Sequence, residues 1–401
     1  MKLKLEYVWL DGYKPEQNLR SKIKIVEYEE VKNAFLDGNF PMWNFDGSST
    51  NQADGSKSDC ILKPVRHYTP QNFPLENNTV YILCEVFNSD ETPHESNKRS
   101  LLSKNNEDFW FGFEQEYFIY DKKTKCILGH DQNNLEPQGK YYCGVGEFVV
   151  GRDFVDEHLN MCLNYGINIT GVNAEVALGQ WEYQVFSKGS FKSGDDLWMS
   201  RYFLNKISEK FNYNIDLHPK PLQKGSWNGS GLHANFSNDK MRNEGGEEYF
   251  NSIFSSLEST HFAHITDYGS DNELRLTGKH ETQNINKFTW GISDRGASIR
   301  IPIETAKEWK GYLEDRRPGS NADPYKIIYQ IVKSINNANI IDEIKYKINF
   351  KIDSDKTKDK FNGILSNEEL LKEYQNDENY PLDDRLMDCK NNVSSVDINS
   401  K

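Results

Sequence analysis

The stretch 109–118, FWFGFEQEYF, constrains this chain most, because an aromatic and apolar segment carries two carboxylates near its centre. Its composition predicts a β-strand. Successive side chains of a strand point to opposite faces, so Glu114 and Glu116 share one face and Gln115 lies on the other. Two adjacent carboxylates in an apolar strand are costly unless a positive charge compensates them. A divalent cation would supply that charge, and a solvated face of an edge strand is the alternative.

Composition and charge exclude several classes of protein. The 401 residues allow two or three domains, and there is no run of about 18 apolar residues that could span a membrane. The formal net charge of −13 argues against a nucleic-acid partner. Residues 1–6 lack the apolar core of a signal peptide, and the six scattered cysteines form no C-x-x-C pair. We therefore expect reduced thiols, a cytoplasmic location, and neither a membrane nor a nucleic-acid partner.

The hydrophobic pattern predicts two regions of different character. Residues 1–90 form a small β-rich domain, with candidate strands at 3–10, 21–27, 62–65 and 79–86. A polar, turn-rich loop is expected from 41 to 59, and a loop of that length in a compact domain is usually functional or mobile. The polar residues 91–108 are typical of a linker.

The larger region spans residues 109–340 and mixes both periodicities. Apolar residues at helical spacing predict helices at 147–165, 195–211 and 247–262. Asp323 followed by Pro324 is a start signal for one more helix. Strands are expected at 109–118, 167–176 and 295–303, and a loop followed by a strand within 217–236. Residues 341–401 are poor in apolar side chains, which predicts a variable, partly ordered extension.

Further carboxylates lie in unusual contexts. Glu175 and Glu182 are seven residues apart, so a straight strand would place them on opposite faces, but Gly179 can break the strand and let them converge. His233 follows a glycine-rich loop, and Glu314 would share a strand face with the arginine two residues later. Each alone has a simpler interpretation, as a solvated glutamate or a core histidine. Together with the first two glutamates they form an oxygen-rich set suited to Mg²⁺ or Mn²⁺.

Arginines complement these carboxylates. Arg275, Arg295 and Arg300 lie in short motifs, and each taken singly is more often a surface salt bridge. As a group beside a carboxylate cluster they suit a substrate with phosphates and carboxylates, which arginine binds bidentately. Metal ions with arginines are a recurrent arrangement for phosphoryl transfer. The chain has neither a G-x-x-x-x-G-K-[ST] motif nor a G-x-G-x-x-G before a helix, which argues against P-loop and dinucleotide-binding sites.

Five blocks of sequence, in family order from residue 43 to 325, resemble the shorter, eukaryotic-type (class II) glutamine synthetases. They are WNFDGSST (43–50), FGFEQEY (111–117), NAEVALGQWEYQ (173–184), KPLQKGSWNGSGLHANF (220–236), and the motifs RLTGKHET, DRGASIRIP and EDRRPGSNADPY within 275–325. The resemblance implies an α+β fold, with a small N-terminal β-grasp-like domain followed by a larger catalytic domain on a curved antiparallel sheet flanked by helices. It implies ATP-dependent ligation of ammonia to glutamate through γ-glutamyl phosphate.

The resemblance also implies roles for individual residues. Two trios match the ligands of two to three Mg²⁺ or Mn²⁺ ions: Glu116, Glu175 and Glu182, and Glu114, His233 and Glu314. The nucleotide-site positions are Trp110, Asn235, Ser237, Arg295, Arg300 and Tyr312. The positions that hold glutamate are Trp227, Asn228, Gly229, Arg275 and Arg316. The catalytic positions are Asp46 and Glu281, which match the ammonium site, and Arg295, which lies near both substrates.

The family assembles as stacked rings, so the resemblance implies a decamer whose active sites lie between neighbouring subunits, with Asp46 contributed to the neighbour's site. Two alternatives stay open: a ligase that joins glutamate to methylamine or a polyamine, and a non-catalytic structural or nitrogen-sensing relative. Retention of Asp46 and Glu281 favours ammonia, and retention of every metal position favours catalysis. Ala177-Leu178 and Ser226 depart from the family pattern without removing a metal-ligand position.

Overall fold

The computed structural model describes residues 1–73, 78–130, 138–223 and 226–354, with side chains up to residue 339. The chain divides into two compact units, the first formed by Met1–Gly245 with His261–Gln330 and the second by Gly246–Thr260 with Ile331–Lys401. Within the described residues, no helix has the length and apolarity needed to cross a membrane. The predicted α+β fold class is confirmed.

The N-terminal sheet of the first unit has five strands in the order β2-β1-β5-β4-β3. Its strands are β1 (Lys2–Leu10), β2 (Leu19–Glu27), β3 (Trp43–Asp46), β4 (Asp59–Tyr68) and β5 (Thr79–Phe87). The central pair β1 and β5 is parallel, and the other pairs are antiparallel. Leu3, Leu5 and Tyr7 alternate into the core, where the short helices α1 (Tyr28–Val31) and α2 (Ala34–Asp37) add Val31 and Ala34.

One prediction for this domain is wrong. The expected loop from 41 to 59 begins with β3, which pairs with β4 and buries Phe45. The segment with Trp43 and Phe45 forms a strand because β4 provides its pairing partner. We predicted β4 as 62–65, but it starts earlier, at Asp59. The rest of the loop contains the 3₁₀ turns η1 (Gly47–Thr50) and η2 (Gly55–Lys57).

The larger sheet has the strand order β12-β13-β14-β11-β6-β9-β8, with β7 and β10 pairing with the end of β6. Its strands are β6 (Trp110–Asp121), β7 (Cys126–Ile127), β8 (Ile169–Ala174), β9 (Gln180–Lys188), β10 (Tyr213–Asp216), β11 (Leu232–Ser237), β12 (Trp290–Ile292), β13 (Ile299–Ile301) and β14 (Leu313–Asp315). Neighbours are antiparallel, as expected, except for β12 and β13 at the edge, which are parallel. The strand predicted over 295–303 shrinks to Ile299–Ile301, because Asp294 caps a turn through the amide of Gly296.

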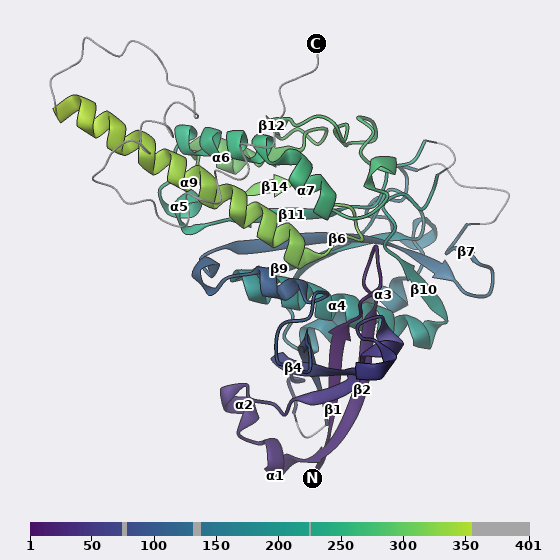
Figure 1. The fold of residues 1–401 in the computed structure, drawn as a ribbon. Helices are drawn as coiled ribbons and strands as arrows, with labels where there is room; N and C mark the ends of the chain where they lie inside the picture. Colours follow the sequence, from purple (N-terminus) through teal and green to yellow (C-terminus); the bar gives the residue numbers. More distant parts are fainter. Residues whose placement is uncertain (74–77, 131–137, 224–225, 355–401) are drawn as a thin grey trace. The chain divides into compact units, whose positions relative to one another are not determined.

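Helix α4 (Ser190–Phe211) lies between the two sheets (Figure 1). Toward the large sheet, Arg201 donates to Gln115 Oε1 at 2.7 Å. Toward the N-terminal sheet, Asp195 accepts from Arg66 at 2.9 Å and from Arg99 of the linker at 2.8 Å. Asp195 is ion-paired and Arg201 is hydrogen-bonded, so both domains and the linker are fixed to one helix.

Other helices differ slightly from the predicted bounds. Helix α3 (Arg152–Asn164) starts later than position 147 because Gly151 precedes it with a φ of +80°. The helix predicted at 247–262 divides into α6 (Glu247–Ser259) and α7 (His261–Asp267). The remaining short helices are α5 (Asp239–Asn243), α8 (Ile303–Glu308), η3 (Lys98–Leu101), η4 (Lys104–Asn106), η5 (Gly146–Phe148) and η6 (Asn272–Leu274).

Helix α9 (Pro324–Ser354) starts at the predicted residue, where Asp323 Oδ1 accepts from the amide of Tyr325 at 2.8 Å. It continues past position 341, and the rest of the predicted extension, 355–401, lies outside the described residues. Within the second unit, the later part of α9 contacts α6. Ser256 Oγ donates to the carbonyl of Ser334 at 2.7 Å, and Tyr249 donates to Asn339 at 2.7 Å.

Candidate active site

Strand β6 separates the core from the candidate site. Glu114 and Glu116 lie on one face, while Gln115 is fully buried on the other and accepts the hydrogen bond from Arg201. Glu114 and Glu116 both line the cavity that contains most of the other candidate residues. This confirms the arrangement expected from the alternation of the strand.

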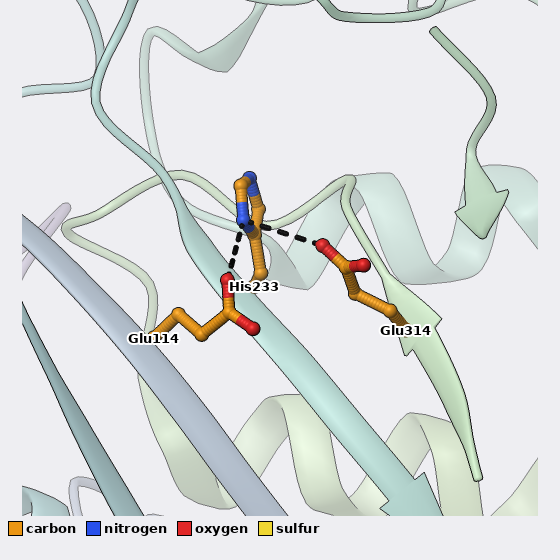
Figure 2. A group of neighbouring side chains, drawn as sticks. All are labelled: Glu114, His233 and Glu314. Atoms are coloured by element: carbon orange, nitrogen blue, oxygen red, sulfur yellow. Dashed lines mark hydrogen bonds and ion pairs between the residues drawn. The ribbon is translucent and has the colours of Figure 1, made fainter. Parts of the chain in front are cut away.

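Strand register brings the first trio together. Glu114 on β6 pairs directly with His233 on β11, and β14 beside β11 carries Glu314. Figure 2 shows both carboxylates approaching the same imidazole nitrogen, with His233 Nδ1 at 3.2 Å from Glu114 and 3.5 Å from Glu314. The three ligand atoms lie within 4.8 Å of one another, close enough for one ion. Burial, with the charge of Arg316, lowers the pKa of His233 well below its ordinary value, which keeps the imidazole neutral.

The second trio consists of Glu116, Glu175 and Glu182. Glu116 and Glu182 are directly opposed on β6 and β9. Gly179, with a φ of +79°, turns the chain between β8 and β9 and lets Glu175 converge on the pair, as predicted. Burial and then carboxylate repulsion raise the pKa of Glu116 and Glu182 to about 8 and that of Glu175 to about 7. Buried carboxylates that repel one another in this way fit a divalent-cation site.

Both trios line one cavity of about 300 Å³. Other predicted residues line it as well: Asn228, Gly229, Arg275, Glu281, Arg295, Arg300 and Arg316. Glu314 on β14 and Arg316, the first residue after this strand, form an ion pair at 2.6 Å. Four further residues line this cavity and were not predicted to do so, because none of them is a carboxylate or an arginine: Tyr142, Gln180, His280 and Thr282.

A second cavity of about 460 Å³ contains the other predicted nucleotide-site residues. Trp110, Asn235, Ser237 and Tyr312 line it, and Glu114 lines both cavities. Asn235 donates to Glu114 Oε1 at 2.8 Å, so the two cavities are connected through one carboxylate.

Arg242 in the second cavity was not predicted. Its guanidinium lies 3.9 Å from the ring centroid of Trp110 and donates to Ser237 Oγ at 3.1 Å. Lys188 approaches the same ring at 4.2 Å. Arg242 lies on the short helix α5, outside every recognised motif, so only the fold brings it to this cavity.

Comparisons with known proteins agree with this geometry. Residues 2–89 match the glutamine synthetase β-grasp domain, and residues 96–262 match the glutamine synthetase catalytic domain. A glutamine synthetase of Bradyrhizobium diazoefficiens is 50% identical over 340 residues, which cover 83% of this chain and 96% of that protein. The chain belongs to the glutamine synthetase family. A glutamine synthetase of Saccharomyces cerevisiae is 46% identical over 328 residues, covering 80% of this chain and 86% of that protein.

A cryo-EM structure of Plasmodium falciparum glutamine synthetase has the same fold, with a TM-score of 0.66 at 16% identity. The match covers 84% of this chain and 72% of that one.

The loop that the glutamine synthetase resemblance assigns to glutamate is held tightly. A Cβ on Gly229 would lie 2.6 Å from Arg275 Cγ and 2.6 Å from the carbonyl of Pro219, so a larger residue does not fit without movement. Asn228 is fixed by Gln138, which accepts from its amide at 2.7 Å. Trp227 is buried in an apolar cluster with Phe118 and Leu222 and so supports the loop from below. Residues 224 and 225 lie outside the described residues.

Arg275 lies under this loop and is almost fully buried. It donates to the carbonyl of Arg316 at 3.0 Å and contacts His233 Nε2 at 3.1 Å. Burial lowers its pKa to about 10, which still leaves it charged at neutral pH.

The predicted ammonium site pairs Glu281 with Asp46, and these two residues lie in different domains of the chain. His280 and Glu281 both have left-handed backbone, with φ of +57° and +59°, and Glu281 lies 3.8 Å from Arg295. Asp46 is exposed at the end of β3, where hydrogen bonds from Ser48 lower its pKa. Among the described residues, Asp46 does not line either of these two cavities.

Proposed function

We propose that this chain catalyses the ATP-dependent ligation of ammonia to L-glutamate, giving L-glutamine, ADP and phosphate through γ-glutamyl phosphate. One observation carries the proposal: a polar cavity of carboxylates and arginines is joined, at Glu114, to a second cavity lined by Trp110 and Tyr312. The first suits glutamate and the phosphates, and the second suits the adenosine of ATP. Membership of the glutamine synthetase family supports the same assignment.

The two trios are our candidates for binding Mg²⁺ or Mn²⁺, two to three ions per site. Bound cations would offset the repulsion among Glu116, Glu175 and Glu182 and neutralise the charge that develops on the transferred phosphoryl group. Because Glu114 and Glu116 belong to different trios, we expect Glu114→Gln and Glu116→Gln to weaken the binding of different ions. Loss of the same single ion in both variants would contradict this division.

We propose that arginines of the first cavity serve the phosphoryl-transfer step. Glutamate's side-chain carboxylate attacks the γ-phosphorus of ATP, and Arg295 and Arg300 would balance the negative charge of the phosphates. Arg300 pairs with Glu314 at 2.6 Å at the boundary of the first trio, which keeps its guanidinium directed toward the cavity. On the other side, Arg275 and Arg316 are charged donors suited to the carboxylates of glutamate.

The second step consumes γ-glutamyl phosphate. Ammonium must lose a proton before it can attack, and a carboxylate pair both binds the cation and accepts the proton. Glu281 is at the cavity, and we propose that Asp46 of a neighbouring subunit completes the pair. The segment of Glu281 is held by Thr282, whose hydroxyl donates to the carbonyl of Arg275 at 3.0 Å. We propose that Glu281, held in this way, also shields the acyl phosphate from water.

The position of Asp46 is compatible with a shared active site. Its carboxylate is exposed on the N-terminal domain and lines neither of the two cavities, which suits a site shared between subunits. As the family resemblance implies, we propose a homo-oligomer of stacked rings, a decamer. The six scattered cysteines, which form no C-x-x-C pair, support the cytoplasm as its location.

A phosphate-release assay tests the function. Protein is supplied with ATP, glutamate, Mg²⁺, and either ammonium, methylamine or a polyamine. We expect phosphate release with ammonium, glutamine as the product, and no activity in excess EDTA. Higher activity with methylamine or a polyamine would support the amine-ligase alternative, and no release with any acceptor would support a non-catalytic relative.

A further inference from the structure

Gln180 lies at the point where the second trio meets the loop assigned to glutamate. It is the first residue of β9, lines the first cavity, and is 1% exposed. Its amide nitrogen donates to Glu116 Oε2 at 3.1 Å and to the carbonyl of Gly229 at 3.2 Å. One side chain therefore connects a candidate metal ligand to the glutamate loop.

The orientation of this amide is fixed by chemistry. The carbonyl of Gly229 can only accept, and Glu116 Oε2 already accepts from the amide of Gly231, so the NH₂ group must face them. Among side chains of this length, an amide supplies two neutral donors from one atom without adding a charge to the cluster.

The same carboxylate oxygen has a second connection to the loop. Glu116 Oε2 also accepts from the amide of Gly231 at 3.0 Å. Glu116 Oε2 thus accepts from Gln180 on β9 and from the amide of Gly231, and Oε1 takes no part in these bonds. A cation bound through Oε1 and a glutamate bound at Gly229 would each favour the same arrangement of Glu116, Gln180 and the loop.

We propose that Gln180 is a positioning residue that couples divalent-cation binding at Glu116, Glu175 and Glu182 to glutamate binding at the Gly229 loop. The inference rests on the proposed function. Because coupling between two binding sites is reciprocal, the cation strengthens glutamate binding by the same factor by which glutamate strengthens cation binding.

Gln184 provides a matched control. It lies on the same strand and the same face, and its amide nitrogen donates to Glu182 and, at 3.0 Å, to Asn173. In the part of the chain that the structure describes, Gln184 makes no hydrogen bond to residues 227–231. It therefore contacts the same trio as Gln180 but lacks the connection to the glutamate loop.

The experiment measures Mn²⁺ binding, not catalysis. Mn²⁺ affinity is determined by electron paramagnetic resonance with and without glutamate, in the absence of ATP, for the full-length wild type, Gln180→Met and Gln184→Met. Loss of a hydrogen bond to a metal ligand typically weakens binding about 10–100-fold, so both variants should bind Mn²⁺ more weakly. Glutamate should tighten Mn²⁺ binding in the wild type and in Gln184→Met. In Gln180→Met, the ratio of the Mn²⁺ affinities with and without glutamate should fall close to one.

Several outcomes would overturn the proposal. The proposal is contradicted if glutamate tightens Mn²⁺ binding in Gln180→Met as much as in the wild type, or if Gln184→Met loses this effect equally. It is also contradicted if glutamate has no effect on Mn²⁺ binding in the wild type. In each of these cases, phosphate release with ammonium would leave the proposed function intact. Absence of Mn²⁺ binding to the wild type would reject both. If Gln180→Met does not fold, Gln180→Asn replaces it, because its amide is one methylene too short to reach both acceptors.

Discussion

The carboxylate of Glu182 should destabilise the cation-free protein, so Glu182→Gln should increase its free energy of unfolding. Burial and the carboxylates of Glu114 and Glu116 raise the pKa of Glu182 from 4.5 to about 8. A carboxylate whose pKa is raised by folding does not lower the free energy of unfolding at a pH below its unfolded pKa. The free energy of unfolding then falls as the pH rises toward the folded pKa. At about 1.4 kcal/mol per pKa unit, the ceiling at high pH is about 5 kcal/mol. Because the neighbouring carboxylates relax to share the repulsion, we expect roughly 2–3 kcal/mol.

The replacement is well suited to this test. A glutamine at 182 keeps an oxygen that can accept from Gln184, so the main change is the loss of charge. Thermal and urea unfolding of the full-length protein are followed in EDTA at pH 5, 7 and 8.5, at one protein concentration. We expect Glu182→Gln to match the wild type at pH 5 and to exceed it increasingly toward pH 8.5.

Added Mn²⁺ should reverse the order of stability, so that the wild type becomes more stable than Glu182→Gln. A cation at a concentration of 100 times its dissociation constant stabilises the wild type by about 2.7 kcal/mol, and the variant with one ligand fewer should gain less. Glu157→Gln, at a surface carboxylate paired with Lys210 at 2.8 Å, serves as the control and should show neither effect. A stability difference in EDTA that does not change with pH would refute the reasoning, because it would show that repulsion among the carboxylates is not the cause.

Three other side chains should give separable effects. Arg242→Ala removes the guanidinium over Trp110 and its bond to Ser237, so the KM for ATP should rise roughly 5–30-fold with little change for glutamate; an unchanged KM for ATP would argue against its place in the nucleotide site. Glu281→Ala should abolish glutamine formation while ATP binding measured by calorimetry is retained, and wild-type activity would exclude Glu281 from the ammonium site. Arg317→Met leaves the fully buried Asp315 without its partner at 2.7 Å, so the free energy of unfolding should fall by roughly 3–5 kcal/mol in a urea titration, and a loss below about 1 kcal/mol would contradict this estimate.

Periodicity predicted much of the local structure, and the errors have identifiable causes. Alternation placed Glu114 and Glu116 on one face of a strand because the period of a strand is a local property. Gly179 was correctly expected to break the strand, since its left-handed backbone is a local property of glycine. The strand at 43–46 was missed because a four-residue strand is stabilised by β4, its partner in the sheet, and only weakly by its own composition.

The second cavity, lined by Trp110 and Tyr312, marks the limit of local reasoning. Motifs identified Trp110, Asn235, Ser237 and Tyr312, but Arg242 reaches the same cavity from a short helix with no distinctive sequence. Its role depends on the path of the chain after β11, which no local pattern specifies.

By itself, the sequence determined the family, the chemical types at the site and the face on which the opening carboxylates lie, because each depends on residue identity and on spacing within one segment. Only the tertiary structure decided which segments meet. The register of β6 against β11 and β9 set Glu114 opposite His233 and Glu116 opposite Glu182, which brings together residues of the two trios that the resemblance had implied. It also placed Gln180 between the second cluster and the glutamate loop. Strand register is fixed by side chains packing over the whole sheet, so pairings across 60 to 120 residues are a property of the fold and not of any one segment.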